Sequence, residues 1–425
     1  MERISIPYPV RTRIGSGVKN VDRAEPVQPG KDWRKRDGLL IPLGIFVFIR
    51  IITLVGALAS EQASPVVNPF VTHRIFQSSL QFVAPHTIGY ALLEPWHRWD
   101  TGWYMKIAGE GYEADDGTTT FLPMYPFLAS VAGSLFSDML VGSMIVSSIS
   151  CLIALMLFYQ LVKVELNSRI RARYALWALV SFPTAFYLLA GYTESTFLAF
   201  VIGAWLAARS KRWWLAAALA ACAGLTRMQA VVLCLPIAWM AFRETPLRLP
   251  MGAARHKYWM DLAARIAAVT AAPAVSLLYN VILYFGGMGK ITDAYARIFG
   301  WQFSTPWANV GGMLSKIASG LASLFDFGQI VALILVVVLS CAAFRRLPFV
   351  YQLYLWPTLI FILTPYAPRQ FLVGMMRYSL SFFPIFIVMG MIAVGRPRLR
   401  VALILCGGAL QCVLLFSFVH WVWIA

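Results

Sequence analysis

The sequence is short of charge, and above all of negative charge. Only 13% of its 425 residues are charged, and 19 Asp and Glu stand against 36 Lys and Arg. A soluble domain of ordinary composition carries about 25% charged residues. Because 59% of the residues are hydrophobic and form long runs rather than alternating segments, the composition indicates a helical membrane protein.

Several common motifs are also missing. The six cysteines all lie in apolar runs and none has CxxC spacing, so we expect neither a disulfide framework nor a zinc site. We find no internal repeat and no GxxxxGK[ST] phosphate loop, which argues against ATP-driven transport by this chain. The net charge of +17 does not indicate nucleic acid binding, because most basic residues sit in short loops between apolar runs.

The distribution of basic and apolar residues divides the chain into two parts. Residues 1–38 are polar and basic and are predicted to form a flexible cytoplasmic tail. We expect no cleavable signal peptide, because the first apolar run (39–60) is long enough to remain as an anchor. Residues 39–425 are predicted to be one transmembrane domain, with a first external loop at 61–138 and a second at 286–325.

Eleven apolar runs are predicted to span the membrane, at residues 39–60, 139–162, 174–190, 196–208, 213–225, 230–242, 262–285, 327–344, 349–363, 376–394 and 401–423. A further apolar stretch, 121–136, is short and has two prolines near its start, so it is read as an interfacial or re-entrant helix. By the positive-inside rule, this arrangement leaves 26 of the 36 basic residues on or near the cytoplasmic side. Arg50 lies inside the first span, with a structural partner and a lipid phosphate as equally plausible contacts.

The stretch from Glu94 to Tyr125 combines carboxylates with many aromatic residues. A helix over 96–108 would align four apolar side chains on one face, namely Trp96, Trp99, Trp103 and Ile107. Asp100 and Tyr104 would lie one turn apart at the edge of that face. Because Trp and Tyr favour the headgroup level of a bilayer, we expect an interfacial helix that holds Asp100 where lipid meets water. A partly desolvated carboxylate there is a candidate general base, unless it simply pairs with Arg98 or Lys106.

Basic residues on the same predicted side form the second feature. Arg227 ends a short helix, and Arg369 and Arg377 flank the turn between two late spans. Arginines at a membrane boundary often only extend to the headgroups, but three that meet one acidic loop would suit a phosphate-bearing lipid. Tyr192, Thr193 and Glu194 share this side, and Glu194 would pair with one of the arginines.

Four segments carry further motifs, namely WDTGWYMKIAGEGY with FLPMYP, SFPTAFYLLAGYTESTFLAF, LTRMQA and RYSLSFFPIF. Together they resemble the glycosylphosphatidylinositol mannosyltransferase II (PIG-V-like) family. WDTGWYMKIAGEGY with FLPMYP is similar to its WDxxWYxxIAxxGY…FPxYP signature, and SFPTAFYLLAGYTESTFLAF to its SPAxxFxxxxYSExxF segment. LTRMQA stands where the family has a TRxxG-type motif, and RYSLSFFPIF resembles its late RYxxxxFP stretch. Two departures, Gln229 for Asn or Gly and RWD for HWD, suggest a prokaryotic relative whose acceptor need not be a glycosylphosphatidylinositol.

The resemblance implies an all-α polytopic fold of the C-type glycosyltransferase superfamily (GT-C), here with about 11 transmembrane helices and interfacial helices in the first external loop. It also implies a polyprenyl-phosphate-mannose donor and a catalytic aspartate that matches Asp100. The predicted function is inverting transfer of mannose to a hydroxyl of a lipid-linked or surface glycan. The active site would face outward from a prokaryotic plasma membrane, or into the endoplasmic reticulum of a eukaryote.

The chemistry is consistent with this implication. A lipid phosphate leaves readily, so one base suffices, with cations to stabilise the developing phosphate charge. The candidate substrate-binding residues are Arg227, Arg369, Arg377, Trp99, Trp103, Tyr104, Tyr192, Glu194 and Gln229. No cofactor is required, although a divalent cation at Asp115 or Asp116 is an alternative. The rival functions are a transporter or flippase of lipid-linked sugars and a non-catalytic subunit of a glycosylation complex.

Overall fold

The structure is a computed structural model that describes residues 33–64, 88–244, 255–367 and 370–424. The described part of the chain is almost entirely helical, and its one small sheet pairs two-residue strands in antiparallel register, Gln302 with Tyr366 and Phe303 with Pro365. Most of the predicted N-terminal tail, 1–32, lies outside the described residues, as does Arg369.

The first half of the chain forms a series of helices separated by short turns. Its elements are α1 (Trp33–Ala63), α3 (Ile88–Leu93), η1 (Glu94–Trp96), α4 (Asp100–Glu110), η2 (Thr118–Thr120), α5 (Met124–Ser134), α6 (Met139–Leu166), α7 (Arg169–Val180), η3 (Ala185–Leu188), α8 (Glu194–Arg209), α9 (Trp213–Gly224), η4 (Met228–Leu233), α10 (Cys234–Ala238) and the π-helical turn η5 (Trp239–Glu244).

The second half completes the bundle. Its elements are α11 (Arg255–Phe285), α12 (Ile291–Phe299), β1 (Gln302–Phe303), α13 (Pro306–Ala318), α14 (Leu324–Ala343), η7 (Phe349–Tyr351), α15 (Gln352–Leu363), β2 (Pro365–Tyr366), α16 (Met375–Tyr378), η8 (Ser379–Ser381), α17 (Phe383–Ala393) and α18 (Pro397–Val419). The predicted external loop 286–325 is thus folded, because it holds α12, β1 and α13.

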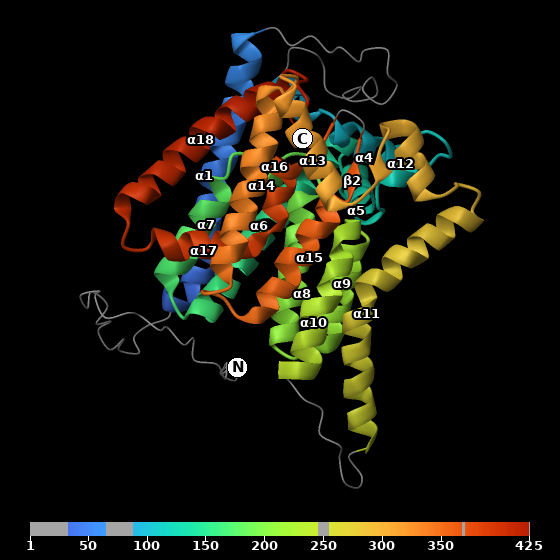
Figure 1. Cartoon of the computed structure of the whole chain (residues 1–425), viewed down its shortest axis with the longest axis vertical. Coiled ribbons are helices and arrows are strands. Elements are labelled where there is room, and N and C mark those ends of the chain that lie inside the picture. Colours follow the sequence, from blue (N-terminus) through green and yellow to red (C-terminus); the bar gives the residue numbers. More distant parts are fainter. Residues whose placement is uncertain (1–32, 65–87, 245–254, 368–369, 425) are drawn as a thin grey trace.

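Long helices run side by side through the molecule, and several short elements, among them α4, α12 and β2, gather at one end (Figure 1). Helix α6 contacts α1, α5, α7 and α8, while α9 lies between α8 and α11. The segment with α4, α12 and β2 lies at the upper right of this view, and α10 lies at the lower end. The elements around Asp100 therefore lie at the opposite end of the bundle from α10.

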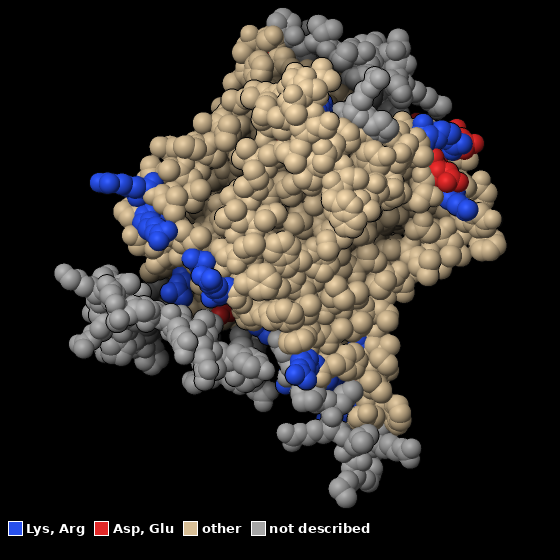
Figure 2. All heavy atoms as spheres, in the orientation of Figure 1, with Lys and Arg blue, Asp and Glu red and all other residues tan. Residues whose placement is uncertain are grey.

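The surface supports a membrane location. Figure 2 shows a face almost free of charge, with Lys and Arg along its left and lower edges and both signs of charge at the upper right. Among the described residues, five helices are long and apolar enough to cross a membrane, namely α1, α6, α11, α14 and α18; α16–η8 and α17, bent by 80°, would make a sixth. The chain is a multi-pass, all-α membrane protein, while the predicted total of eleven spans is not confirmed.

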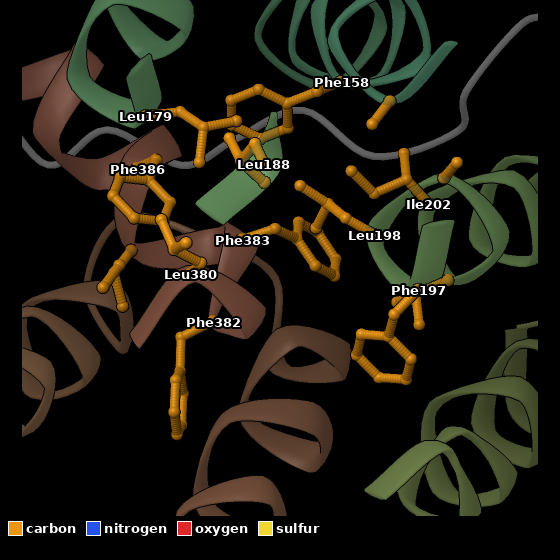
Figure 3. Close-up of a cluster of buried hydrophobic side chains, with 14 of the residues drawn as sticks. Phe158, Leu179, Leu188, Phe197, Leu198, Ile202, Leu380, Phe382, Phe383 and Phe386 are labelled. Carbon is orange, nitrogen blue, oxygen red and sulfur yellow. The ribbon is translucent and has the colours of Figure 1, made fainter. Parts of the chain in front are cut away.

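The core consists of large apolar side chains from segments far apart in the sequence. Phe158, Leu179, Phe197 and Phe383 lie together in its centre (Figure 3), and each is fully buried or nearly so. Close helix contacts require glycine at several points. A Cβ on Gly142 would lie 2.4 Å from the carbonyl oxygen of Ala129, so α5 and α6 could not otherwise approach so closely.

Four predicted helices were wrong in their boundaries or continuity. The helix predicted at 96–108 begins only at Asp100, because Trp99 has a φ of 53° and cannot continue a right-handed helix. The helix predicted at 174–190 ends at Val180, shortly before Pro183. The run 230–242 is divided among η4, α10 and η5, and 376–394 bends by 80°.

Candidate functional site

Asp100 occupies the first turn of α4, where the helix dipole favours a negative charge. The left-handed backbone of Trp99 sets the chain direction just before it, and the Trp99 ring packs edge-on against Trp421 and Trp423. The Asp100 side chain is 18% exposed, and its Oδ2 lies 2.6 Å from Nη1 of Arg377. Its backbone N–H donates to the Tyr192 hydroxyl at 3.3 Å. The carboxylate is thus held by Arg377 but keeps access to solvent.

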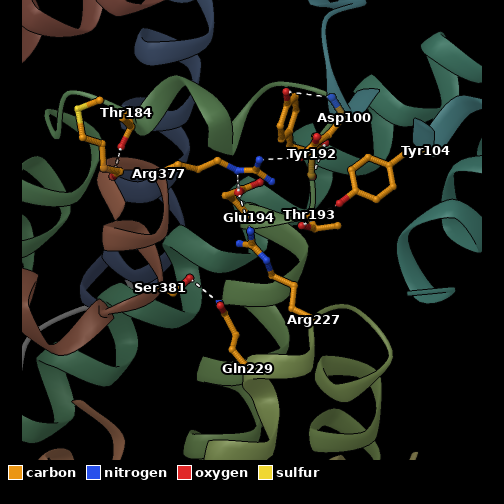
Figure 4. A network of polar contacts seen from close by, with 12 residues as sticks. Asp100, Tyr104, Thr184, Tyr192, Thr193, Glu194, Arg227, Gln229, Arg377 and Ser381 are labelled. Atoms are coloured by element: carbon orange, nitrogen blue, oxygen red, sulfur yellow. Dashed lines mark hydrogen bonds and ion pairs between the residues drawn. The ribbon is translucent and has the colours of Figure 1, made fainter. Parts of the chain in front are cut away.

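Glu194, the first residue of α8, joins two arginines from distant segments. Its buried Oε1 accepts a hydrogen bond from Nε of Arg377 and lies 3.0 Å from Nη2 of Arg227. Arg377 therefore bridges Asp100 and Glu194, as Figure 4 shows. Asp100, Glu194, Arg227 and Arg377 thus form one network of four charges. Arg369, the third arginine of the predicted set, lies outside the described residues.

One donor of this network has no partner. Nη1 of Arg227 is buried and forms no hydrogen bond with any residue that the structure describes. Leaving a buried charged donor unpaired costs on the order of 1–3 kcal/mol. An anionic ligand that reached Nη1 of Arg227 would remove this cost. Oε2 of Glu194 is likewise buried without a hydrogen-bond partner among the described residues.

Aromatic rings surround the two guanidinium groups. Arg377 lies 4.5 Å from the ring centre of Tyr192 and 5.3 Å from that of Tyr187, and Arg227 lies 5.0 Å from that of Tyr378. Such rings stabilise a cation where water is excluded. Tyr187 and Tyr378 were not predicted as site residues, although both lie within the segments quoted for the family resemblance.

Two further predicted binding residues, Tyr104 and Trp103, differ in the contacts that they make. The Tyr104 hydroxyl donates to Oγ1 of Thr193 at 3.5 Å, and burial, followed by the charge of Asp100, raises the pKa of Tyr104 well above its usual value. Tyr104 is therefore a neutral donor at physiological pH. Trp103 stacks on Phe121 with ring centres 5.6 Å apart and packs edge-on against Phe299.

Gln229 does not face the charged network directly. Its amide nitrogen donates to Oγ of Ser381 at 2.8 Å and so links η4 to η8 beneath the two arginines (Figure 4).

Arg50, in the first predicted span, has a structural partner, because its Nη1 donates to the carbonyl oxygen of Leu189 at 3.0 Å.

Most of the remaining carboxylates of the first loop are paired elsewhere. Asp116 lies 2.6 Å from Lys106, Asp115 pairs with Arg297, and Glu94 pairs with Arg98. Asp100 therefore does not pair with Arg98 or Lys106, the alternatives that the sequence allowed. Within the described ranges, no three His, Cys, Asp or Glu residues come together as a metal-binding group.

The comparisons with known proteins agree with the motif resemblance. The family model "Mannosyltransferase (PIG-V)" matches residues 42–244. Residues 42–244, just under half of the chain, are therefore PIG-V-like. No curated protein and no solved structure matches the chain.

The match supports a membrane mannosyltransferase in general. Its range includes Asp100, Glu194 and Arg227 of the PIG-V-like site, whereas Arg377 lies beyond its end. The fold brings Arg377 back to the matched part, 277 positions from Asp100 in the sequence.

Proposed function

We propose that the chain transfers mannose from a polyprenyl-phosphate-linked donor to a hydroxyl of a lipid-linked or surface glycan, with inversion at the anomeric carbon. The observation that carries this proposal is the 2.6 Å contact of Asp100 with Arg377. Arg377 and Arg227 are in turn held together, because both contact the carboxylate of Glu194. In the proposed complex, the Asp100 carboxylate contacts the acceptor hydroxyl, and Arg227 and Arg377 contact the phosphate of the donor.

Asp100 is the general base of the proposed reaction. It takes the proton of the acceptor hydroxyl as that oxygen bonds to C1, while the bond from C1 to the phosphate oxygen breaks and the phosphate leaves with the electron pair. Protonation neutralises Asp100, so the charge of Arg377 becomes available to the departing phosphate. The unpaired Nη1 of Arg227 is a second donor to that phosphate. A β-linked donor yields an α-mannoside.

Glu194 holds the two arginines and does not act as an acid. Its Oε1 contacts both guanidinium groups, and the residue is 2% exposed, so no substrate hydroxyl reaches it easily. No second carboxyl group is needed, because a lipid phosphate leaves without protonation, unlike the sugar alkoxide of a glycosidase. Trp99, Trp103 and Tyr104 border the network and are proposed contacts for the sugar or lipid.

We expect no required cofactor, since the arginines supply the positive charge that this chemistry needs. A divalent cation at Asp115 and Asp116 would have to displace Arg297 and Lys106. The proposed topology has a cytoplasmic N-terminus and an external active site. It is supported by the excess of basic residues in the loops predicted to be cytoplasmic.

Transfer by the purified chain tests this function. The chain in liposomes receives radiolabelled polyprenyl-phosphate-β-mannose and a lipid extract as the source of acceptor, and the product is analysed for its anomeric configuration. We expect an α-mannosylated product. Movement of intact donor across the vesicle membrane without transfer would support a flippase, and neither activity would support a non-catalytic subunit; both results would overturn the proposal.

A further inference from the structure

An apolar groove runs along α8 from Thr196 to Ser210, and none of the four charged residues of the network lines it. It has a volume of about 750 Å³ and is formed by α5, α6, α8 and α9. Several of the residues that line it are also open to the outside, including Ile149 at 55% and Ile153 at 44% exposure. A groove of this size accommodates a lipid chain that enters from the side. Arg212 is its single charged lining residue, and Asp100, Arg227 and Arg377 are not part of it.

A second, basic cavity continues from the groove. It has a volume of about 520 Å³ and shares Arg212 and Leu215 with the groove. Its basic lining residues are Lys211, Arg212, His256 and Lys257. Its one carboxylate, Asp261, lies 2.7 Å from Arg265, so its charge is already compensated. Among the described residues, no carboxylate forms an ion pair with Lys211, Arg212 or Lys257.

The turn between α8 and α9 fixes two of these basic residues. The N–H of Lys211 donates to the carbonyl of Ala208, and that of Arg212 donates to the carbonyl of Ala207, the pattern of a Schellman motif. Lys211 takes the left-handed position of this motif, with a φ of 58°, where glycine is usual. The turn thus accepts strain and presents two adjacent cations at the mouth of the groove.

We propose that the basic cavity and the groove together bind an anionic bilayer phospholipid, with its phosphate at Lys211, Arg212 and Lys257 and an acyl chain in the groove. A lipid phosphate is bound by cations, and an acyl chain is bound by an apolar groove. Here the basic cavity and the apolar groove are adjacent, because Arg212 lines both of them. Trp213 and Trp214 also line the basic cavity, and indole rings favour the headgroup level of a bilayer.

This site is separate from the candidate active site. Helix α8 carries Glu194 at its first residue and Arg209 at its last, and its 16 residues span about 24 Å at 1.5 Å per residue. A lipid phosphate at Arg212 is thus too far away to react at Asp100. Figure 2 shows basic side chains at the lower end of the molecule, near α10 and opposite α4. The proposal stands independently of the proposed function.

Native mass spectrometry of the full chain tests the proposal. The protein is incubated with equal amounts of phosphatidylglycerol and phosphatidylcholine, and the lipid that stays bound is counted. We expect at least tenfold preference for phosphatidylglycerol, lost in the double variant K211Q/R212Q. The matched control is R345Q/R346Q, which removes two exposed arginines that line neither cavity, and it should keep the preference.

A further variant and a competitor address the chain and the headgroup separately. Ile153→Trp enlarges an exposed groove residue and should lower retention of phosphatidylglycerol without lowering the melting temperature. Equal retention by K211Q/R212Q and its control would overturn the proposal. Displacement of the lipid by millimolar inorganic phosphate would instead identify a site for soluble anions. Displacement by polyprenyl phosphate would assign the groove to the donor, and either displacement contradicts the proposal.

Discussion

Replacing Glu194 by glutamine removes the negative charge that holds the two arginines together. Glu194 is 2% exposed, Arg377 is 4% exposed and Arg227 is 9% exposed, so both guanidinium groups would keep their charge in a largely buried place. Removal of one partner from a buried ion pair costs about 3–5 kcal/mol. The glutamine oxygen can take the place of Oε1, which contacts both arginines, and the NH₂ group can take the place of Oε2, for which the described residues supply no hydrogen-bond partner. The hydrogen bonds can therefore remain, whereas the negative charge is lost. We therefore expect a loss of stability toward the lower end of that range.

Turnover should fall as well, because Arg227 and Arg377 would no longer be fixed relative to Asp100. A displacement of about 1 Å in a positioned group costs roughly 10²-fold in rate. Unfolding in detergent, followed by circular dichroism, measures stability, and transfer of labelled mannose measures turnover at saturating donor.

The matched control for this variant is Glu165→Gln. The side chain of Glu165 is also largely buried, with 4% of it exposed, and it lies 2.6 Å from Arg209 at the other end of α8. Its replacement should lower stability similarly but leave turnover per folded molecule unchanged. If both variants lost turnover in the same proportion, or if Glu194→Gln kept full turnover, the positioning role of Glu194 would be refuted.

Three further predictions concern single contacts. Gly407→Ala should destabilise the fold by about 1–3 kcal/mol, since its Cβ would lie 2.0 Å from the Ser181 carbonyl oxygen; thermal unfolding measures this. Burial raises the pKa of Asp116, but hydrogen bonds from Lys106 and Thr118 outweigh it and lower that pKa overall. Ionised Asp116 thus stabilises its loop at neutral pH. The protection of the loop amides from hydrogen exchange, corrected for the intrinsic exchange rate at each pH, should therefore fall below about pH 4. Tyr192→Phe removes the acceptor of the Asp100 N–H and should lower turnover several-fold.

Each of these predictions has a contrary result. Gly408 has no atom within 4 Å of its added Cβ, so an equal loss of stability in Gly408→Ala would refute the contact argument for Gly407. Unchanged protection of the loop amides between pH 6 and pH 3, or the same loss of protection in Asp116→Asn, would refute the role of the Asp116 carboxylate. Wild-type turnover in Tyr192→Phe would show that this hydroxyl does not help to position the base.

Several helices were predictable because an apolar run ends where basic or turn residues begin. The run predicted at 213–225 is α9 (Trp213–Gly224), and that predicted at 327–344 is α14 (Leu324–Ala343). The errors arose where hydropathy alone continued a helix through a break. Pro183 and Pro384 were visible in the sequence and mark two of these breaks, whereas the positive φ of Trp99 has no such signal.

The residue types of the site were predictable, but their pairing was not. Asp100, Glu194, Arg227 and Arg377 stood out as rare charges in an apolar chain. Which arginine meets which carboxylate depends on contacts across 277 and 183 positions, which no local pattern encodes. Tyr187 and Tyr378 escaped notice for the same reason, because buried aromatic residues are common in such a chain and only the fold brings these two to the arginines.

The central claim is that the Asp100 carboxylate takes the proton of the acceptor, and turnover of Asp100→Asn tests it most directly. The asparagine keeps the shape of the side chain, and Asp116→Asn is the control, since it removes a neighbouring carboxylate of the same loop. A general base contributes about 10²–10⁴-fold to the rate. The account predicts a loss of this size in Asp100→Asn with normal folding and near-normal turnover in Asp116→Asn. Wild-type turnover in folded Asp100→Asn would contradict it.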